Sequence, residues 1–236
     1  MTNDFFILLL TTVSVGFIHT LAGPDHYLPF IALARAGNWS KMKTFIITLF
    51  CGLGHILSSL IIGFSGIALG FTINSVTSAE TFRGNVAGWL MIAFGLIYTI
   101  WGIKQSLKNK SHSHHHVHSD GILHEHEHSH SSGHVHVHSD TQKKLTPWIL
   151  FVVFIFGPCE PLIPLVMYPA SKGNYIDSLV VAGVFGSATI VTMLVLTFFG
   201  LAGIKILPVN KLEKNMHALA GAVILICGIS MKFFGL

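Results

Sequence analysis

Long apolar segments separated by short polar ones dominate the hydrophobic pattern of this chain. A transmembrane helix needs about 20 predominantly apolar residues to cross the hydrocarbon core. The pattern predicts about six such helices, and we therefore expect an all-α polytopic membrane protein. The predicted helices cover about residues 4–34 (broken near Gly23-Pro24), 42–72, 85–106, 147–170, 176–207 and 216–235.

Composition agrees with a membrane protein. Of the 236 residues, 51% are hydrophobic and only 10% are charged, whereas a soluble domain carries about 25% charged residues. The net charge of +4 gives no reason to expect nucleic acid as a partner. The cysteines, Cys51, Cys159 and Cys227, all lie in apolar segments and imply no disulfide framework.

The basic residues predict an orientation. The loops after the first, third and fifth predicted helices carry eleven Lys and Arg, against three (Arg83, Lys172 and Lys232) on the other side. The positive-inside rule places the first set in the cytoplasm and both termini outside. We therefore expect a multi-pass protein of the cytoplasmic membrane whose partner is the lipid bilayer, with homo-oligomerisation left open.

The two halves of the chain resemble each other. The segment GPDHYLPFIALARAGN (23–38) is similar to GPCEPLIPLVMYPASKGN (157–174). Because each half holds three predicted helices, the second copy must run upside down relative to the first. Inverted repeats with broken helices are typical of secondary transporters. We expect three-helix repeats at 1–107 and 147–236, joined by a His-rich loop at 108–146.

Polar residues near the two Gly-Pro breaks form a candidate metal site. Asp25 and Glu160 are the acidic residues expected deep in apolar sequence, where a carboxylate costs about 2.5–3.5 kcal/mol on insertion scales. The repeat alignment sets Asp25 opposite Cys159 and His26 opposite Glu160. The expected ligands are His19, Asp25, His26, His55, Cys159 and Glu160.

This set of imidazole, carboxylate and thiolate ligands suits nickel, cobalt or zinc, since magnesium and calcium prefer oxygen ligands alone. Metal binding displaces ligand protons, so the same groups suit exchange of a proton for a cation. Structural alternatives stay open: His55 as a hydrogen-bonding residue, Cys159 as a packing residue, and Asp25–His26 as a structural pair. We expect no enzyme activity and no tightly bound cofactor, and no P-loop motif indicates ATP hydrolysis.

A histidine-rich tract, SHSHHHVHSDGILHEHEHSHSSGHVHVHSD, separates the two halves. It has no hydrophobic period and should be disordered without metal, and such tracts bind transition ions through neutral imidazoles. Its predicted cytoplasmic location favours export over import. The expected accessory ligands are His112, His114, His115, His116, His118, His124, His126, His128, His130, His134, His136 and His138.

These motifs resemble those of known membrane families. His19 followed by Asp25-His26 is similar to the H-x4-D-H signature of nickel/cobalt transporters, with one extra residue, and the GLGH sequence around His55 resembles a second segment of that family. The layout resembles the efflux branch with its His-rich loop. The resemblance implies that His19, Asp25 and His26 recognise Ni2+ or Co2+.

The segment GPCEPLIPL also resembles the Pro-Cys segments of membrane thiol-electron carriers related to cytochrome c biogenesis proteins, in a wider superfamily that includes lysine exporters. That resemblance implies electron transfer by Cys159 with Cys51 or Cys227. A further alternative is a membrane metal-binding accessory protein for a nickel enzyme.

Overall fold

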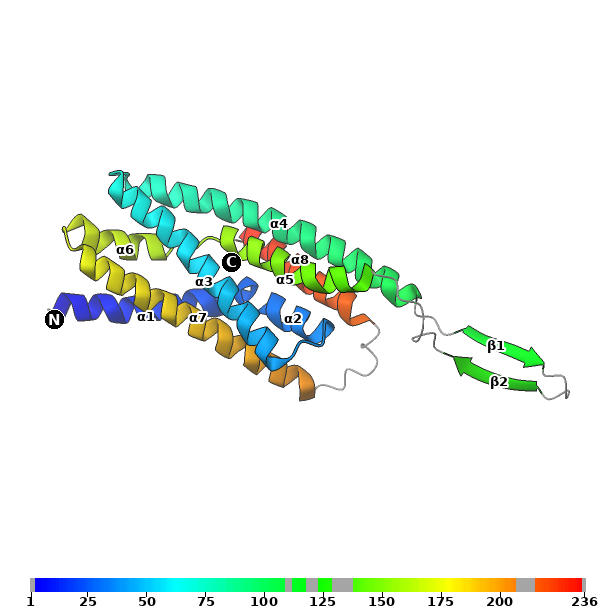
Figure 1. Ribbon diagram of the computed structural model, residues 1–236. Coiled ribbons are helices and arrows are strands. Elements are labelled where there is room, and N and C mark those ends of the chain that lie inside the picture. Colours follow the sequence, from blue (N-terminus) through cyan, green and yellow to red (C-terminus); the bar gives the residue numbers. More distant parts are fainter. Residues whose placement is uncertain (1–2, 109–111, 118–122, 129–137, 207–214, 235–236) are drawn as a thin grey trace.

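The computed structural model describes residues 3–108, 112–117, 123–128, 138–206 and 215–234. These residues form a bundle of helices, with a two-stranded antiparallel sheet beyond the end of α4 (Figure 1). The elements are α1 (Asn3–Ala22), the 3-10 helix η1 (Pro24–His26), α2 (Leu28–Ala36), α3 (Lys41–Ala68), α4 (Ile73–Lys108), β1 (His112–Val117), β2 (Leu123–His128), α5 (His138–Phe156), α6 (Leu162–Ser171), α7 (Tyr175–Ile206) and α8 (Met216–Phe234).

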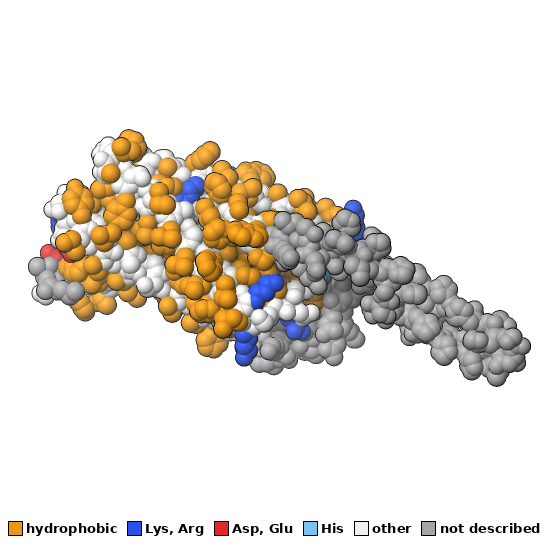
Figure 2. Space-filling model, viewed as in Figure 1, with side chains coloured by type: hydrophobic (Ala, Val, Ile, Leu, Met, Phe, Trp, Pro, Cys, Tyr) orange, Lys and Arg blue, Asp and Glu red, His pale blue; other side chains and the backbone are white. Residues whose placement is uncertain are grey.

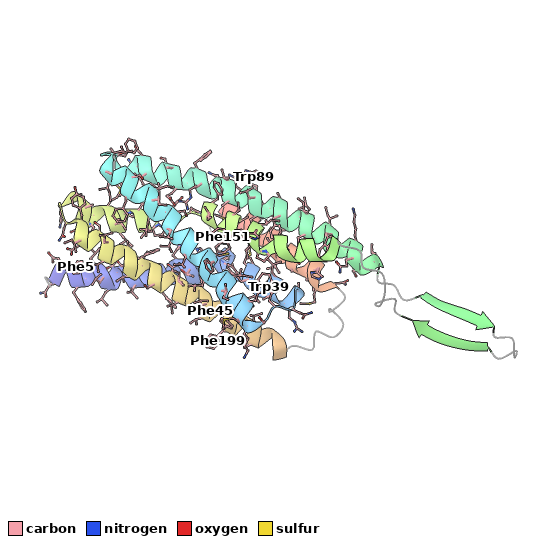
Figure 3. The ribbon with its side chains drawn as sticks, viewed as in Figure 1. Phe5, Trp39, Phe45, Trp89, Phe151 and Phe199 are labelled. Atoms are coloured by element: carbon pink, nitrogen blue, oxygen red, sulfur yellow. The ribbon has the colours of Figure 1, made fainter. Side chains whose placement is uncertain are left out.

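Helices long and apolar enough to cross a membrane dominate the described residues. Five meet that description: α1, α3, α4, α7 and α8. Large apolar side chains cover the outer face of the bundle (Figure 2). Phe45 and Phe199, for example, lie on the outside of α3 and α7 (Figure 3), and Phe199 is 73% exposed. An apolar surface of this extent fits lipid rather than water, so the prediction of an all-α polytopic membrane protein is confirmed.

The predicted helix at 147–170 is divided in the structure. It consists of the apolar part of α5 and the short helix α6, separated by residues 157–161. Pro158 and Pro161 lie in this break, and proline removes a backbone donor and clashes with the preceding turn. The described part of the chain therefore holds five continuous spans and one divided segment.

The two halves have the same order of elements. In each half a broken helix (α1–η1–α2, or α5–α6) precedes a long helix and a final helix. Figure 1 shows α1–α2 running towards the end of the bundle that carries the sheet, and α5–α6 running away from it. The opposite directions are those expected of inverted repeats.

The helix α4 begins much earlier than the pattern predicts, at Ile73 instead of near residue 85. Its first turns are rich in Ser, Thr and Asn, so hydropathy alone does not extend the apolar segment this far. The early start places Glu80 and Arg83 in a helix inside the bundle. The count of basic residues in the loops included Arg83. In the structure Arg83 belongs to α4 instead.

Close packing of α4 against α8 joins the two halves of the chain. A Cβ atom added to Gly95 would lie 2.4 Å from the backbone nitrogen of Leu225, and one on Gly221 would lie 2.4 Å from that of Thr99. Small residues are the usual means by which membrane helices approach each other. This contact fixes the position of α8 against α4.

Part of the His-rich tract forms the antiparallel pair β1–β2. The register sets His112 opposite His128, His114 opposite His126, and His116 opposite His124. His138 is the first residue of α5. The predicted dependence of order on metal stays a prediction, and His118, His130, His134 and His136 lie outside the described residues.

Candidate metal site at the first helix break

The first helix break is a single tight turn. Helix α1 ends where the backbone N–H of Gly23 donates to the carbonyl of His19 (3.0 Å), and Pro24 opens η1. The backbone N–H of His26 donates to the carbonyl of Gly23 (3.1 Å). Because Pro24 cannot continue an α-helical ladder, the turn brings Asp25 and His26 to the interior of the bundle.

Three histidine rings from three elements meet at this turn. The ring centroid of His26 lies 4.9 Å from that of His19 on α1 and 5.2 Å from that of His55 on α3. One nitrogen from each ring can be chosen so that the three lie within 4.8 Å of one another. His26 and His55 are buried, and His19 is partly buried.

Several nitrogen atoms of this cluster have no hydrogen-bond partner. They are Nε2 of His19, Nε2 of His26 and both ring nitrogens of His55. Buried polar atoms in folded proteins are nearly always paired, so unpaired ones require an explanation. A bound cation would explain them, because it would accept lone pairs from imidazole nitrogens of all three rings.

The surroundings of His26 assign its tautomer. Its Nδ1 atom lies 3.1 Å from the carbonyl oxygen of Gly23 and 3.3 Å from Oδ1 of Asp25. Both neighbours are acceptors when the carboxylate is ionised, so we assign the proton of a neutral ring to Nδ1. That assignment leaves the lone pair of Nε2 free for a metal, and a carboxylate behind a ligating imidazole is the usual outer partner of such sites.

A small cavity of about 10 Å³ adjoins the cluster. Asp25, His26 and His55 line it, together with apolar residues that include Met91 and Phe154. Metal–nitrogen bonds are about 2.0–2.1 Å long, so two ligands of one ion lie at most about 4.2 Å apart. The three nitrogens lie within 4.8 Å of one another, which is wider than this limit, so binding of one ion requires the rings to move closer together.

The two expected ligands from the second break lie elsewhere. Glu160 is exposed, and its Oε1 accepts a hydrogen bond from the hydroxyl of Thr81 (2.8 Å). Cys159 is fully buried and belongs to an apolar cluster with Ile56 and Leu162. Among the described residues, the group with suitable ligand atoms close together comprises His19, His26 and His55, without Asp25, Cys159 or Glu160.

Sequence reasoning missed the most deeply buried acid of the bundle. We expected Asp25 and Glu160 to be the buried acids, yet Glu80 is fully buried, and its Oε1 lies 2.5 Å from Nη1 of Arg83. The opposite charges three residues apart would have been a signal if the helix had been extended to cover them.

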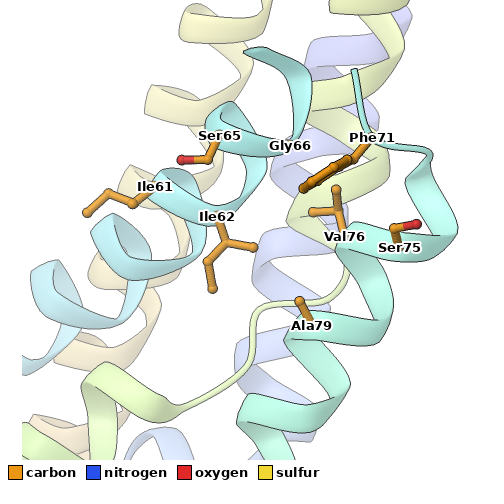
Figure 4. A pocket seen from close by; sticks show the side chains of 8 residues that line it. All are labelled: Ile61, Ile62, Ser65, Gly66, Phe71, Ser75, Val76 and Ala79. Carbon is orange, nitrogen blue, oxygen red and sulfur yellow. The ribbon is translucent and has the colours of Figure 1, made fainter. Parts of the chain in front are cut away.

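A larger cavity, of about 420 Å³, lies between α3 and the first turns of α4 (Figure 4). Its lining includes Ile61, Ile62, Phe71 and Val76, with the hydroxyls of Ser65 and Ser75 as its side-chain polar groups. It offers no carboxylate, imidazole or thiol, so it is unsuited to a transition metal.

The fold and the site together define a polytopic membrane protein with buried histidines beside a broken helix. The chain belongs to the family described as the cytochrome C biogenesis protein transmembrane region, whose model matches residues 28–230. No curated protein and no solved structure matches the chain. The match supports the resemblance of GPCEPLIPL to thiol-electron carriers better than the resemblance to nickel/cobalt transporters. The matched segment includes His55 and Cys159, but it begins after His19 and His26.

Proposed function

We propose that this protein transports a divalent transition metal, Ni2+ or Co2+, with Zn2+ as a further substrate, across the cytoplasmic membrane. The observation that carries the proposal is the convergence of His19, His26 and His55, with unpartnered nitrogens, beside Asp25 inside a membrane-spanning bundle. Neutral imidazoles bind these borderline ions well. Asp25 supplies the negative charge that offsets part of the cost of bringing a cation to this depth.

The proposed ligands come from three different elements. His19 is on α1, His26 is in η1 and His55 is on α3. A small displacement of α3 against the first break would separate the three nitrogens and release the ion. Protons returning to the imidazoles and to Asp25 would compete with metal and so couple transport to a proton gradient.

The histidine tract suggests the direction of transport. With the tract in the cytoplasm, as the basic loops predict, it would collect ions inside the cell. Collection at that side favours export. Deletion of the tract should then lower the rate at low metal concentration and leave the membrane site intact.

Membrane electron transfer between thiols is the second candidate, and the family match favours it. Cys51, Cys159 and Cys227 are free, buried thiols. Cys51 and Cys227 belong to one apolar cluster and Cys159 to another. Asp25 occupies the position that a second cysteine would take at the first break. A metal-binding accessory protein for a nickel enzyme is a third candidate, and it would bind metal without transport.

Metal flux in proteoliposomes distinguishes these candidates. We expect Ni2+ or Co2+ flux from the intact protein and, at saturating metal, retained flux in a 112–138 deletion and in Cys159→Ser. Asp25→Asn should lose most of its flux at metal concentrations near the KM of the intact protein. Loss of function in Cys159→Ser alone, with thiol–disulfide exchange by the intact protein, would establish the electron carrier. Metal binding by the tract with no flux would establish the accessory protein.

A matched control shows whether an effect of Asp25→Asn comes from the proposed site or from the loss of any negative charge. Asp177→Asn removes a partly exposed carboxylate near the start of α7, where Asp177 accepts a hydrogen bond from the side-chain amide of Asn174. We expect this variant to transport like the intact protein. Equal losses in Asp25→Asn and Asp177→Asn would argue against a site at Asp25.

A further inference from the structure

Glu80 and Arg83 form a charged pair inside the bundle. The side chain of Glu80 is fully buried and that of Arg83 is 11% exposed, with Nη1 of Arg83 donating to Oε1 of Glu80 at 2.5 Å. Ionised groups within membrane segments are costly, and they are kept mainly where they serve a function. Neither residue belongs to the histidine cluster, so the pair needs its own explanation.

The pair binds the backbone on both sides of the second break. Nη2 of Arg83 donates to the carbonyls of Gly157 (2.6 Å) and Ile155 (3.2 Å), at the end of α5. Oε2 of Glu80 accepts from the backbone N–H of Cys159 (3.0 Å), ahead of α6. A helix end leaves carbonyls and N–H groups without intrahelical partners. Arg83 and Glu80 supply both kinds of missing partner.

The same pair is tied to the helix that carries His55. Nη2 of Arg83 donates to the hydroxyls of Ser58 (2.9 Å) and Ser59 (3.2 Å), and the hydroxyl of Ser59 donates to Oε2 of Glu80 (3.0 Å). These serines lie one helical turn after His55 on α3. The pair therefore connects α3, α4 and the second break.

The second break in turn packs against His55. A Cβ atom added to Gly157 would lie 2.9 Å from Nδ1 of His55, so the carbonyl that Arg83 holds belongs to a residue in contact with the ring. On the opposite side, a Cβ added to Gly84 of α4 would lie 2.7 Å from Cγ of Pro158. The position of this backbone limits where the imidazole of His55 can lie.

We propose that Glu80 and Arg83 are positioning residues, which hold the α5–α6 break against His55 and so set the geometry of the three-histidine site. This inference rests on the proposed metal transport. The first break carries ligands and is fixed by His26 itself, whereas the second break carries none of the three imidazoles and is fixed by charges from α4. A guanidinium suits this role because it presents five donors in a fixed plane, whereas an ammonium presents three rotatable ones.

The test compares Arg83→Lys and Glu80→Gln with Asn85→Ala in the full chain. Asn85 is a matched control because it lies on the same helix and bonds to Lys232. One measurement is alkylation of each cysteine by N-ethylmaleimide, followed by mass spectrometry. The other is the KM for Co2+ flux in proteoliposomes.

We expect Cys159 to react about tenfold faster in Arg83→Lys and Glu80→Gln, because its backbone loses a fixed position. Cys51 and Cys227 serve as internal controls and should react as before. The KM for Co2+ should rise about tenfold or more, as it does when outer partners of metal ligands are lost. Asn85→Ala should change neither quantity.

The double variant Glu80→Gln with Arg83→Met covers the case in which a single change leaves an unpaired buried charge and prevents folding. It should fold, yet keep the raised KM and the fast reaction of Cys159. Unchanged Cys159 reactivity, equal increases at all three cysteines, or an unchanged KM would overturn the proposal. Absence of Co2+ flux in the intact protein would instead refute metal transport, and the alkylation pattern would still show whether the pair holds the break.

Discussion

The Nδ1 atom of His26 lies 3.3 Å from the Oδ1 atom of Asp25, the residue before it in the chain. The 3-10 turn that follows Gly23-Pro24 makes this approach possible. With the carbonyl of Gly23 on the same nitrogen, the proton of a neutral ring is held at Nδ1 and Nε2 is directed away from both acceptors. The break in the helix thus leaves the lone pair of Nε2 free, as the proposed metal site requires.

Asp25→Asn tests that relationship. The amide keeps the shape of the side chain but removes the charge behind the imidazole, and loss of such an outer partner typically costs about 10–100-fold in metal affinity. We expect the KM for Co2+ flux to rise by about that factor, measured in proteoliposomes. A variant with intact-protein kinetics would show that Asp25 does not act on His26.

Removing a proposed ligand ring should reduce Co2+ flux more than removing the Asp25 carboxylate beside His26. We expect His55→Ala to lower Co2+ flux by more than about 100-fold, since its two ring nitrogens are buried and unpartnered. His217→Ala is the matched control, because His217 lies at the start of α8 and bonds to the hydroxyl of Tyr98 (2.9 Å). Comparable losses in both variants would place the effect outside the three-histidine site.

The sequence predicted the helical membrane fold and the first break, because proline after glycine within an apolar run removes a backbone donor and favours a kink or break in the helix. It singled out His19, His26 and His55 as candidate ligands, since polar residues are rare in such segments, and the structure brings these three side chains close together. It did not predict the position of Glu160, because the order of residues in a non-helical break does not fix which way each one points. Glu80 and Arg83 were missed because the polar first turns of α4 lie outside any apolar window.

The register of the β1–β2 pair predicts which histidines of the tract bind the same metal ion. Successive residues of a strand alternate between faces, so the pairs His114–His126 and His116–His124 fall at positions on one face. His115, opposite Glu125, falls on the other. Replacing His114 and His126 by Ala should lower the amount of Ni2+ bound by the purified protein at equilibrium more than replacing His115. If bound Ni2+ falls by the same amount for each histidine removed, the strand register does not determine which histidines bind the metal.

Two glycine substitutions test the geometry of the site without removing any ligand. A Cβ atom on Gly23 would lie 2.6 Å from Nδ1 of His26 and 2.9 Å from Oδ1 of Asp25, which is too close for either side chain to remain in place. Gly183 on α7 has no atom within 4 Å of its added Cβ. In a helix interior, replacing glycine by alanine is slightly stabilising, by about 0.5–1 kcal/mol. We therefore expect Gly183→Ala to transport normally.

Gly23→Ala should displace the ring of His26 from the carbonyl of Gly23 and from the carboxylate of Asp25, and separate it from His19 and His55. The expected result is a rise of about tenfold or more in the KM for Co2+, with thermal stability in detergent close to that of Gly183→Ala. The measurement pairs flux in proteoliposomes with a melting curve for each variant. Unchanged flux in Gly23→Ala would mean that the arrangement of His26 and Asp25 at the break does not control metal transport, and it would count against the site as a whole.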